Sequence, residues 1–186
     1  MVADVADMAF RAITATVKGG SALERHLRSI EKSLGQGAHV RVGFLGSATY
    51  PAGKDVGKQV AQVAAWNEFG TIAPDANEEN NQGETPKGIP ERPFIRTMVA
   101  KKSPRWGQQL GVALKKSNYD AMKGLAIMGE IMQGQMRDSI ENWTNPPNAD
   151  ATVKRKGFNK PLIDTGFMKT SVDYQVLDGE NSSDDD

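Results

Sequence analysis

Two short segments constrain the fold most, because they alternate apolar and polar side chains as a strand with one buried face does. They are "HVRVGFLG" at 39–46 and "SVDYQV" at 171–176, near opposite ends of the 186-residue chain. Most of the sequence between them has the spacing of helices or the composition of loops. We therefore predict an α+β fold in which these two strands form a small antiparallel sheet packed against a long helix.

The long helix is predicted over residues 118–143, with Ser117 and Asp120 as a capping pair at its start. Its apolar face carries Leu125, Met128, Met132, Met136, Ile140 and Trp143. Its interior also contains Gly124, Gly129 and Gly134. A glycine inside a helix costs about 1 kcal/mol relative to alanine. Such a cost is usually offset by the close approach of another element, either in the same subunit or in a neighbour.

A helical pair is predicted at the N-terminus, in "DVADMAFRAITATVKGG" at 4–20 and "SALERHLRSIEKSLGQG" at 21–37. In the second segment, Ser21 followed three residues later by Glu24 has the spacing of a capping box, with Ser21 as the N-cap. The apolar residues of that segment form one stripe, and Gly35 can end the helix in the left-handed conformation.

Three further helices are predicted from spacing and caps. One covers 57–70 and ends at Gly70. Another covers 94–116 in two parts, restarting at Ser103 followed by Pro104, the preferred order of cap and first helical residue. A short helix or turn is expected over 151–157.

The least foldable internal stretch is the loop at 71–93, which is polar, mostly acidic and contains four prolines and two glycines. A loop of this length inside a compact domain is usually functional or disordered. The last residues given, "DGENSSDDD", are acidic, and we expect 179–186 to be a disordered tail. No internal repeat or domain boundary is evident, so residues 1–178 are predicted to form a single domain.

The composition offers little for catalysis or metal binding. The chain has no cysteine, which excludes disulfides, thiolate metal sites and a cysteine nucleophile. His26 and His39 are the only histidines, so a His-rich metal site is excluded and a catalytic triad would need one of them. The carboxylates of the 71–93 loop lack the fixed geometry that acid–base chemistry demands. We therefore predict no catalytic, cofactor or metal site, and a protein that is not an enzyme.

Charge and hydropathy exclude two further classes. Lys plus Arg equals Asp plus Glu, 23 each, whereas a protein that binds duplex DNA by counterion release usually has a positive excess. No run of about 18 apolar residues is present, so no membrane-spanning helix is predicted. The one basic cluster is Lys154, Arg155 and Lys156, with Lys160 nearby. It could meet DNA phosphates or an acidic partner, or be a solvated helix end.

Asp164, in "PLIDTGFMKTS", invites two interpretations. It stands where an N-cap belongs, and its carboxylate could accept from the backbone N–H groups of Gly166 or Phe167. The triplet "DTG" also occurs in aspartic proteases, but that site needs an all-β fold and a symmetry-related second Asp. Because helical patterns dominate this chain, we predict a structural cap.

Four blocks, in order, carry a resemblance to a known family. They are "VAAWNEFGT" at 63–71, "IPERPFIRTM" at 89–98, "PPNADATVKRKG" at 146–157 and "KPLIDTGFMKTSVDYQV" at 160–176. Together they resemble the head–tail joining, or tail-completion, proteins of tailed bacteriophages. The ordered set spans more than half of the chain and is far more specific than any single block.

The resemblance implies an α+β subunit of a homo-oligomeric ring, commonly a hexamer, at the neck of the virion. Such a ring contacts the portal or adaptor (connector) and the tail terminator, and it encloses the DNA channel without binding DNA specifically. It would be made in the cytoplasm of the bacterial host. The residues of the blocks that we expect at an interface are Trp66, Phe69, Ile89, Arg92, Phe94, Lys154, Arg155 and Lys156.

Two alternatives to this function stay open at the level of sequence. The chain could be another virion subunit, a tail terminator or a tail-tube protein, which differs in partner rather than in class. It could also be a DNA-binding module that uses the basic cluster at 154–160.

Overall fold

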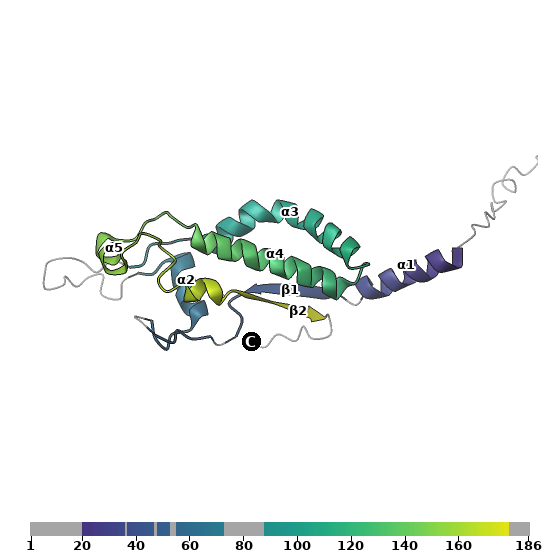
Figure 1. The fold of residues 1–186 in the computed structure, drawn as a ribbon, viewed down its shortest axis with the longest axis horizontal. Coiled ribbons are helices and arrows are strands. Elements are labelled where there is room, and N and C mark those ends of the chain that lie inside the picture. Colours follow the sequence, from purple (N-terminus) through teal and green to yellow (C-terminus); the bar gives the residue numbers. More distant parts are fainter. Residues whose placement is uncertain (1–19, 36, 47, 53–54, 73–87, 179–186) are drawn as a thin grey trace, which may run out of the picture.

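The two predicted strands pair with each other. In the computed structural model, which describes residues 20–35, 37–46, 48–52, 55–72 and 88–178, β1 (Ala38–Gly43) and β2 (Asp173–Asp178) form an antiparallel two-stranded sheet. Val40 lies opposite Val176 and Val42 opposite Tyr174, so the apolar residues share one face. The helix α4 (Ala121–Glu141) crosses that face (Figure 1). The predicted α+β class and its antiparallel sheet on a long helix are confirmed.

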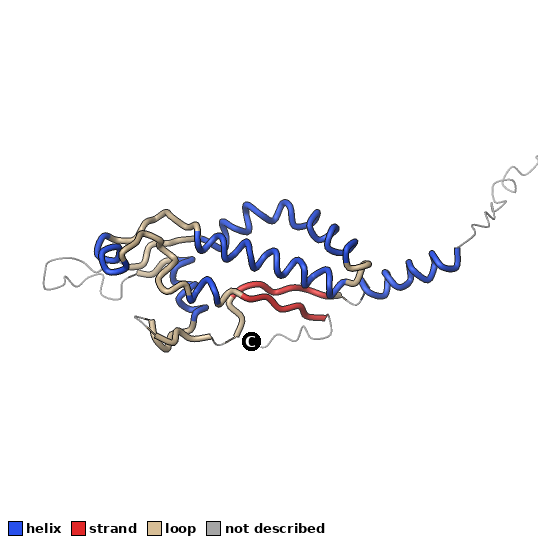
Figure 2. The backbone as a smooth tube through the Cα atoms, viewed as in Figure 1, coloured by secondary structure: helices blue, strands red, loops and turns tan. Residues whose placement is uncertain are grey.

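A second long helix, α3 (Phe94–Lys116), packs on the other side of α4, so α4 lies between α3 and the sheet (Figure 2). The two helices are antiparallel. At one end the Ser139 hydroxyl donates to the Phe94 carbonyl (2.8 Å), and at the other end Leu114 packs over Gly124. Within the described residues the structure is mostly helical.

Three shorter helices surround one end of this stack. They are α2 (Val60–Phe69), α5 (Asp150–Lys156) and the single turn α6 (Phe167–Thr170). The buried core lies where α2, the start of α3, the end of α4 and α6 meet. Its members are Val60, Ala64, Phe94, Met98, Met136, Ile140, Leu162, Met168 and Val172.

The helix α1 (Gly20–Gly35) extends away from the body at the opposite end of the molecule (Figure 1). Two apolar residues of this helix are open to solvent, Leu23 at 56% and Leu27 at 54% exposed. It contains Ser21, whose predicted role as N-cap was wrong, because the helix already includes Gly20. Glu24, the other half of that capping box, pairs instead with Arg28 at 2.7 Å. The first helix of the predicted pair, 4–20, lies almost entirely outside the described residues, as do most of the 71–93 loop and the acidic tail.

The start of α4 also differs from the prediction. The N-cap is Asp120, whose carboxylate accepts from the Lys123 backbone N–H at 3.0 Å. Ser117 is not the cap; its hydroxyl donates to the Leu114 carbonyl at the end of α3. Between them Asn118 and Tyr119 adopt positive φ values of 53° and 61° to reverse the chain. This tight turn delays the start of α4 beyond the predicted capping pair.

The helix α3 is continuous, so the predicted restart at Ser103 was wrong. Pro104 lies inside the helix and lacks the N–H that would bond to the carbonyl four residues earlier. Ala100, Ser103 and Pro104 are all exposed. The freed carbonyl can therefore bond to water, which makes this proline tolerable at the cost of one helical hydrogen bond.

Two of the three α4 glycines allow close packing within the subunit. A Cβ at Gly124 would lie 2.7 Å from Leu114 Cδ2, and a Cβ at Gly129 would lie 2.7 Å from Cγ of Tyr174. These glycines let α3 and β2 approach α4 from its two sides. A Cβ at Gly134 would meet nothing within 4 Å. No described residue packs there to offset the helix-propensity cost of that glycine.

Candidate binding pocket

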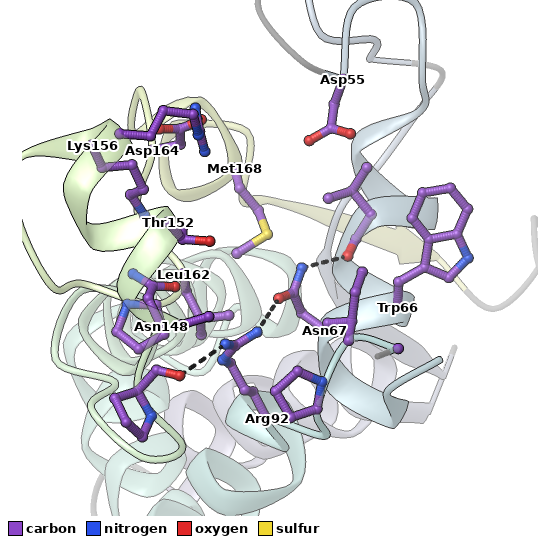
Figure 3. Close-up of a pocket in the computed structure, with 18 of the residues that line it drawn as sticks. Asp55, Trp66, Asn67, Arg92, Asn148, Thr152, Lys156, Leu162, Asp164 and Met168 are labelled. Atoms are coloured by element: carbon purple, nitrogen blue, oxygen red, sulfur yellow. Dashed lines mark hydrogen bonds and ion pairs between the residues drawn. The ribbon is translucent and has the colours of Figure 1, made fainter. Parts of the chain in front are cut away.

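The four sequence blocks meet at the end of the molecule opposite α1. The first block forms most of α2, and the second forms the segment that leads into α3 and its first turn. The third block forms α5 and the turn before it, and the fourth runs through α6 into β2. Between them lies a pocket with a volume of about 690 Å³ (Figure 3). Its polar and charged lining consists of Asp55, Lys58, Asn67, Arg92, Asn148, Thr152, Arg155, Lys156 and Asp164. Its apolar walls include Val63, Trp66, Ile89, Leu162 and Met168.

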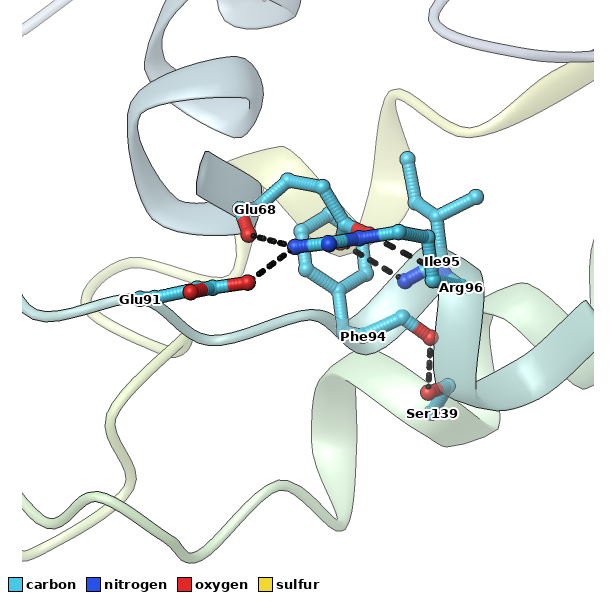
Figure 4. A network of polar contacts seen from close by, with 6 residues as sticks. All are labelled: Glu68, Glu91, Phe94, Ile95, Arg96 and Ser139. Carbon is cyan, nitrogen blue, oxygen red and sulfur yellow. Dashed lines mark hydrogen bonds and ion pairs between the residues drawn. The ribbon is translucent and has the colours of Figure 1, made fainter. Parts of the chain in front are cut away.

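Glu68 joins the first block to the second by capping α3 from another helix (Figure 4). The residue is only 2% exposed, and its carboxylate accepts from the backbone N–H groups of Ile95 (2.8 Å) and Arg96 (3.0 Å). These N–H groups belong to the first turn of α3, whose N-cap residue, Pro93, makes no side-chain cap hydrogen bond. A carboxylate at a helix N-terminus is favourable for both hydrogen bonding and the helix dipole.

Arg96 completes this network. Its Nε donates to the Glu68 carboxylate at 3.0 Å and its Nη2 to the Glu68 carbonyl at 2.9 Å. It also pairs with Glu91. The hydrogen bonds that Arg96 donates to Glu91 and then to Glu68 raise the pKa of its guanidinium. The guanidinium lies 5.1 Å from the centroid of the Phe69 ring, so one face of this exposed ring is in contact with a cation.

The backbone at Gly70 fixes the distance between these two blocks. Gly70 has a φ of 74°, and a Cβ there would lie 3.0 Å from the Ile89 carbonyl oxygen. The neighbouring Thr71 N–H donates to that same carbonyl (2.9 Å), and the Thr71 hydroxyl accepts from the Ile89 N–H (3.0 Å). A side chain at position 70 is therefore opposed by both backbone conformation and space.

Arg92 connects three of the four blocks. Its guanidinium donates to Asn67 Oδ1 (3.2 Å) and to the carbonyls of Pro146 and Pro147 (both 3.3 Å), as the dashed lines in Figure 3 show in part. Arg92 is 6% exposed and Phe94 fully buried. The prediction for Phe94 is corrected here, because its side chain lies in the core and offers no surface to a partner. Arg92 holds the blocks together and also lines the pocket.

The other apolar candidates are accessible. Trp66 and Ile89 are half-buried and line the pocket, and Lys58 lies 5.1 Å above the Trp66 ring. Phe69 is 67% exposed. These three side chains remain candidates for contact with a partner.

The basic cluster divides around α5. Lys154 and Arg155 are exposed and Lys156 is partly buried. Arg155 and Lys156 line the pocket, whereas Lys154 does not. The Lys156 ammonium donates to the Lys160 carbonyl at 2.8 Å and lies 5.0 Å from the Phe158 ring centroid. Two residues of the predicted basic cluster, Arg155 and Lys156, therefore form part of the pocket wall.

Asp164 is not the cap of α6. The N-cap is Gly166, which has a φ of 82°, and the Phe167 N–H donates instead to the Thr165 hydroxyl at 3.3 Å. Because Gly166 takes the left-handed conformation, the helix begins at Phe167 and the Asp164 carboxylate makes no cap hydrogen bond. Asp164 is exposed and forms an ion pair of 3.6 Å with Arg155.

Replacing Asp164 by alanine is expected to change the free energy of unfolding by less than about 0.5 kcal/mol, because the residue is exposed and its ion pair is long. Urea unfolding followed by circular dichroism measures this. A loss of more than about 1 kcal/mol, the usual cost of removing a true N-cap, would contradict the structure.

The described residues give little support for acid–base or metal chemistry at this site. His26 lies on α1 and His39 on β1, and neither lines the pocket. Burial, and then the charges of Asp55 and Asp164, raise the pKa of Tyr50 to about 12, so this phenol stays protonated at neutral pH. Among the described residues no group of three His, Asp or Glu side chains could hold a metal ion.

Comparison of the chain with protein-family models, curated proteins and solved structures gives no match. No helix in the described part of the chain has the length and apolar character needed to cross a membrane.

Sequence reasoning missed Glu68 and Asn67. One signal for Glu68 was present: the segment that begins α3 offers no capping side chain of its own, so its free N–H groups need an acceptor from elsewhere. The acceptor lies 27 residues away, which no local pattern reveals.

Proposed function

We propose that the chain is a structural subunit of the neck of a tailed bacteriophage, in a ring that joins the connector to the tail terminator around the DNA channel. One observation carries this proposal. The four blocks that resemble tail-completion proteins converge on one end of the fold, and their polar groups, Glu68, Arg92 and Thr71 among them, bind one another. Because these polar groups stabilise the fold, they favour a structural role in which the shape of that end contacts other proteins.

The opposite half of the molecule supports association with other copies. Besides the exposed Leu23 and Leu27 of α1, a groove between α3 and α4 exposes apolar surface, including Val112 at 49%. Ile127 and Ile131 line the same groove and are half-buried. In a ring, contact between neighbouring copies would remove such surface from water at roughly 25 cal/mol per Å².

The DNA-binding alternative is weaker. Arg155 pairs with Asp164, and the Lys156 ammonium bonds to a carbonyl within the subunit. Only Lys154 and Lys160 of the cluster lie outside the pocket lining. Two lysines provide too few phosphate contacts for tight, salt-resistant binding to a duplex.

The groove is tested by replacing Val112 with aspartate in the phage or prophage that encodes the chain. We expect the purified variant to fold with an unchanged thermal midpoint, because the residue is half exposed. Infectious particles should fall by about tenfold or more, since a charge buried in an interface is costly. Electron microscopy should then show unjoined heads and tails.

Val99→Asp is the matched control, because Val99 is on the same helix, is 39% exposed and does not line the groove. It should yield normal particles. Normal particles from Val112→Asp as well would contradict the assignment of the groove to assembly.

A further inference from the structure

The pocket at the convergence of the blocks contains a buried positive charge that no carboxylate of the described chain neutralises. Arg92 is 6% exposed, and each of its hydrogen bonds goes to a neutral oxygen, on Asn67, Pro146 or Pro147. Burial lowers the pKa of its guanidinium. A guanidinium has five N–H donors, and these bonds use three. Buried charges are normally paired, so two free donors beside an open pocket indicate a place for an anion.

A second group in the same pocket lacks a partner. Asn148 is 9% exposed, and its side-chain Nδ2 has no hydrogen-bond acceptor in the described structure. The residue is held in place by its backbone N–H, which donates to Asn159 Oδ1 at 3.1 Å. Leaving a buried donor unsatisfied costs about 1–3 kcal/mol. Asn148 and Arg92 line the pocket together, as Figure 3 shows.

The other charges of the pocket favour a singly charged ligand. Its two carboxylates each have a cation of their own: Asp55 pairs with Lys58 at 2.9 Å and Asp164 with Arg155 at 3.6 Å. Lys156 forms no ion pair in the described residues and adds positive charge at the wall. A carboxylate can pair with Arg92 and leave both existing pairs intact. The second charge of a phosphate would add repulsion from Asp55 and Asp164.

The pocket is also much larger than a carboxylate. Its volume of about 690 Å³ is in the range of pockets that enclose drug-sized ligands. Val63, Leu162 and Met168 give it apolar walls. The ligand must therefore carry apolar groups next to its charge.

We propose that this pocket receives an acidic side chain of a partner protein, an Asp or Glu flanked by apolar residues on an extended segment, with its carboxylate bound by Arg92 and Asn148. The inference goes beyond the proposed function, because it names a site and the chemistry of its partner. In a neck ring, the partner segment would belong to an adjacent virion protein.

The test measures binding of two capped peptides, acetyl-ALELA-amide and acetyl-ALQLA-amide, to the full chain by isothermal titration calorimetry. The two peptides differ in a single carboxylate. We expect the Glu peptide to bind about tenfold more tightly or better, since a site built for a charged group rejects the analogue that lacks it. NMR should show shifts of the Asn148 side-chain amide and the Trp66 indole. Equal affinities, or no binding of the Glu peptide up to about 1 mM, would overturn the proposal.

Two variants locate the site. Asn148→Asp places a like charge in the path of the ligand and should abolish the preference for the Glu peptide. Lys156→Gln, at the partly exposed wall, should weaken binding severalfold. Because this residue lies outside the core, the variant still tests the site if Asn148→Asp fails to fold. Lys102→Gln, exposed on α3 and outside the pocket, is the matched control and should bind as the unaltered chain does. Unchanged binding by Lys156→Gln, or equal loss in Lys102→Gln, would contradict the assignment.

Competition with two further ligands tests whether the site is specific for a peptide. Acetate that competes with the Glu peptide at equal concentration would show a small-carboxylate site and overturn the protein partner, as would competition by a DNA duplex. The peptide experiment uses the isolated chain, and the neck assignment is tested in particles. Failure of one is therefore distinguishable from failure of the other.

Discussion

Glu68→Ala is expected to lower the free energy of unfolding by about 2–4 kcal/mol. The substitution removes the acceptor for the backbone N–H groups of Ile95 and Arg96 and a charge-assisted bond to the Arg96 side chain. Each buried donor left without a partner costs about 1–3 kcal/mol. Urea unfolding at neutral pH measures the loss. Amide hydrogen exchange should show the first turn of α3 as the region most weakened.

Two controls separate the cap from the surface ion pair. Glu68→Gln keeps one acceptor oxygen in nearly the same shape and should cost about 1 kcal/mol. Glu91→Gln removes only the half-exposed partner of Arg96 and should cost less than about 0.5 kcal/mol. If Glu91→Gln cost as much as Glu68→Ala, the stabilisation would lie in the ion pair and not in the cap.

The second large effect is expected at the contact between α4 and the sheet. A Cβ at Gly129 would lie 2.7 Å from Cγ and 2.8 Å from Cε2 of Tyr174, so Gly129→Ala forces the strand and helix apart. Such overpacking costs about 1–3 kcal/mol, against about 1 kcal/mol gained in helix propensity. We expect a net loss of up to about 2 kcal/mol in urea unfolding.

Gly134→Ala is the matched control with the opposite sign. Because nothing lies within 4 Å of a Cβ there, the subunit should gain about 0.5–1 kcal/mol. If another copy approaches α4 at Gly134, the same variant should also impair head–tail joining. A loss of stability in the isolated subunit would show that the space at Gly134 is filled in solution.

The periodicity of the sequence was sufficient for the central architecture. Alternation in the two strand segments gave both the pairing and the shared apolar face of Val40, Val42, Tyr174 and Val176, because register follows from which face is buried. The glycine pattern of α4 correctly indicated close approach at Gly124 and Gly129. These predictions succeeded because each depends on residues that are near in sequence or repeat regularly.

The helix ends could not be predicted in the same way. Ser117 and Asp164 both occupy plausible capping positions, but the left-handed residues Asn118, Tyr119 and Gly166 shift where the helices begin. The start of α3 is capped by Glu68, which comes from another helix. Local sequence patterns cannot predict these helix ends, because several local hydrogen-bonding arrangements have nearly equal free energy and tertiary contacts select among them.

The pocket itself was not predicted from the sequence, although the four blocks supply most of its lining. The four sequence blocks converge on this pocket. Phe94 nevertheless proved to be a core residue, Arg92 is buried but lines the pocket, and Trp66 and Ile89 are accessible at its wall. Residues that hold a binding end together and residues that contact a partner lie side by side in these blocks, so sequence alone does not separate them.

The most direct test of the central proposal is the position of this chain in intact particles. A gold-labelled antibody, or an added tag at the acidic tail, can be located by electron microscopy of the tailed phage that encodes it. Our account predicts label confined to the junction between head and tail. Label along the whole tail, or particles that are joined and infectious without the chain, would contradict it.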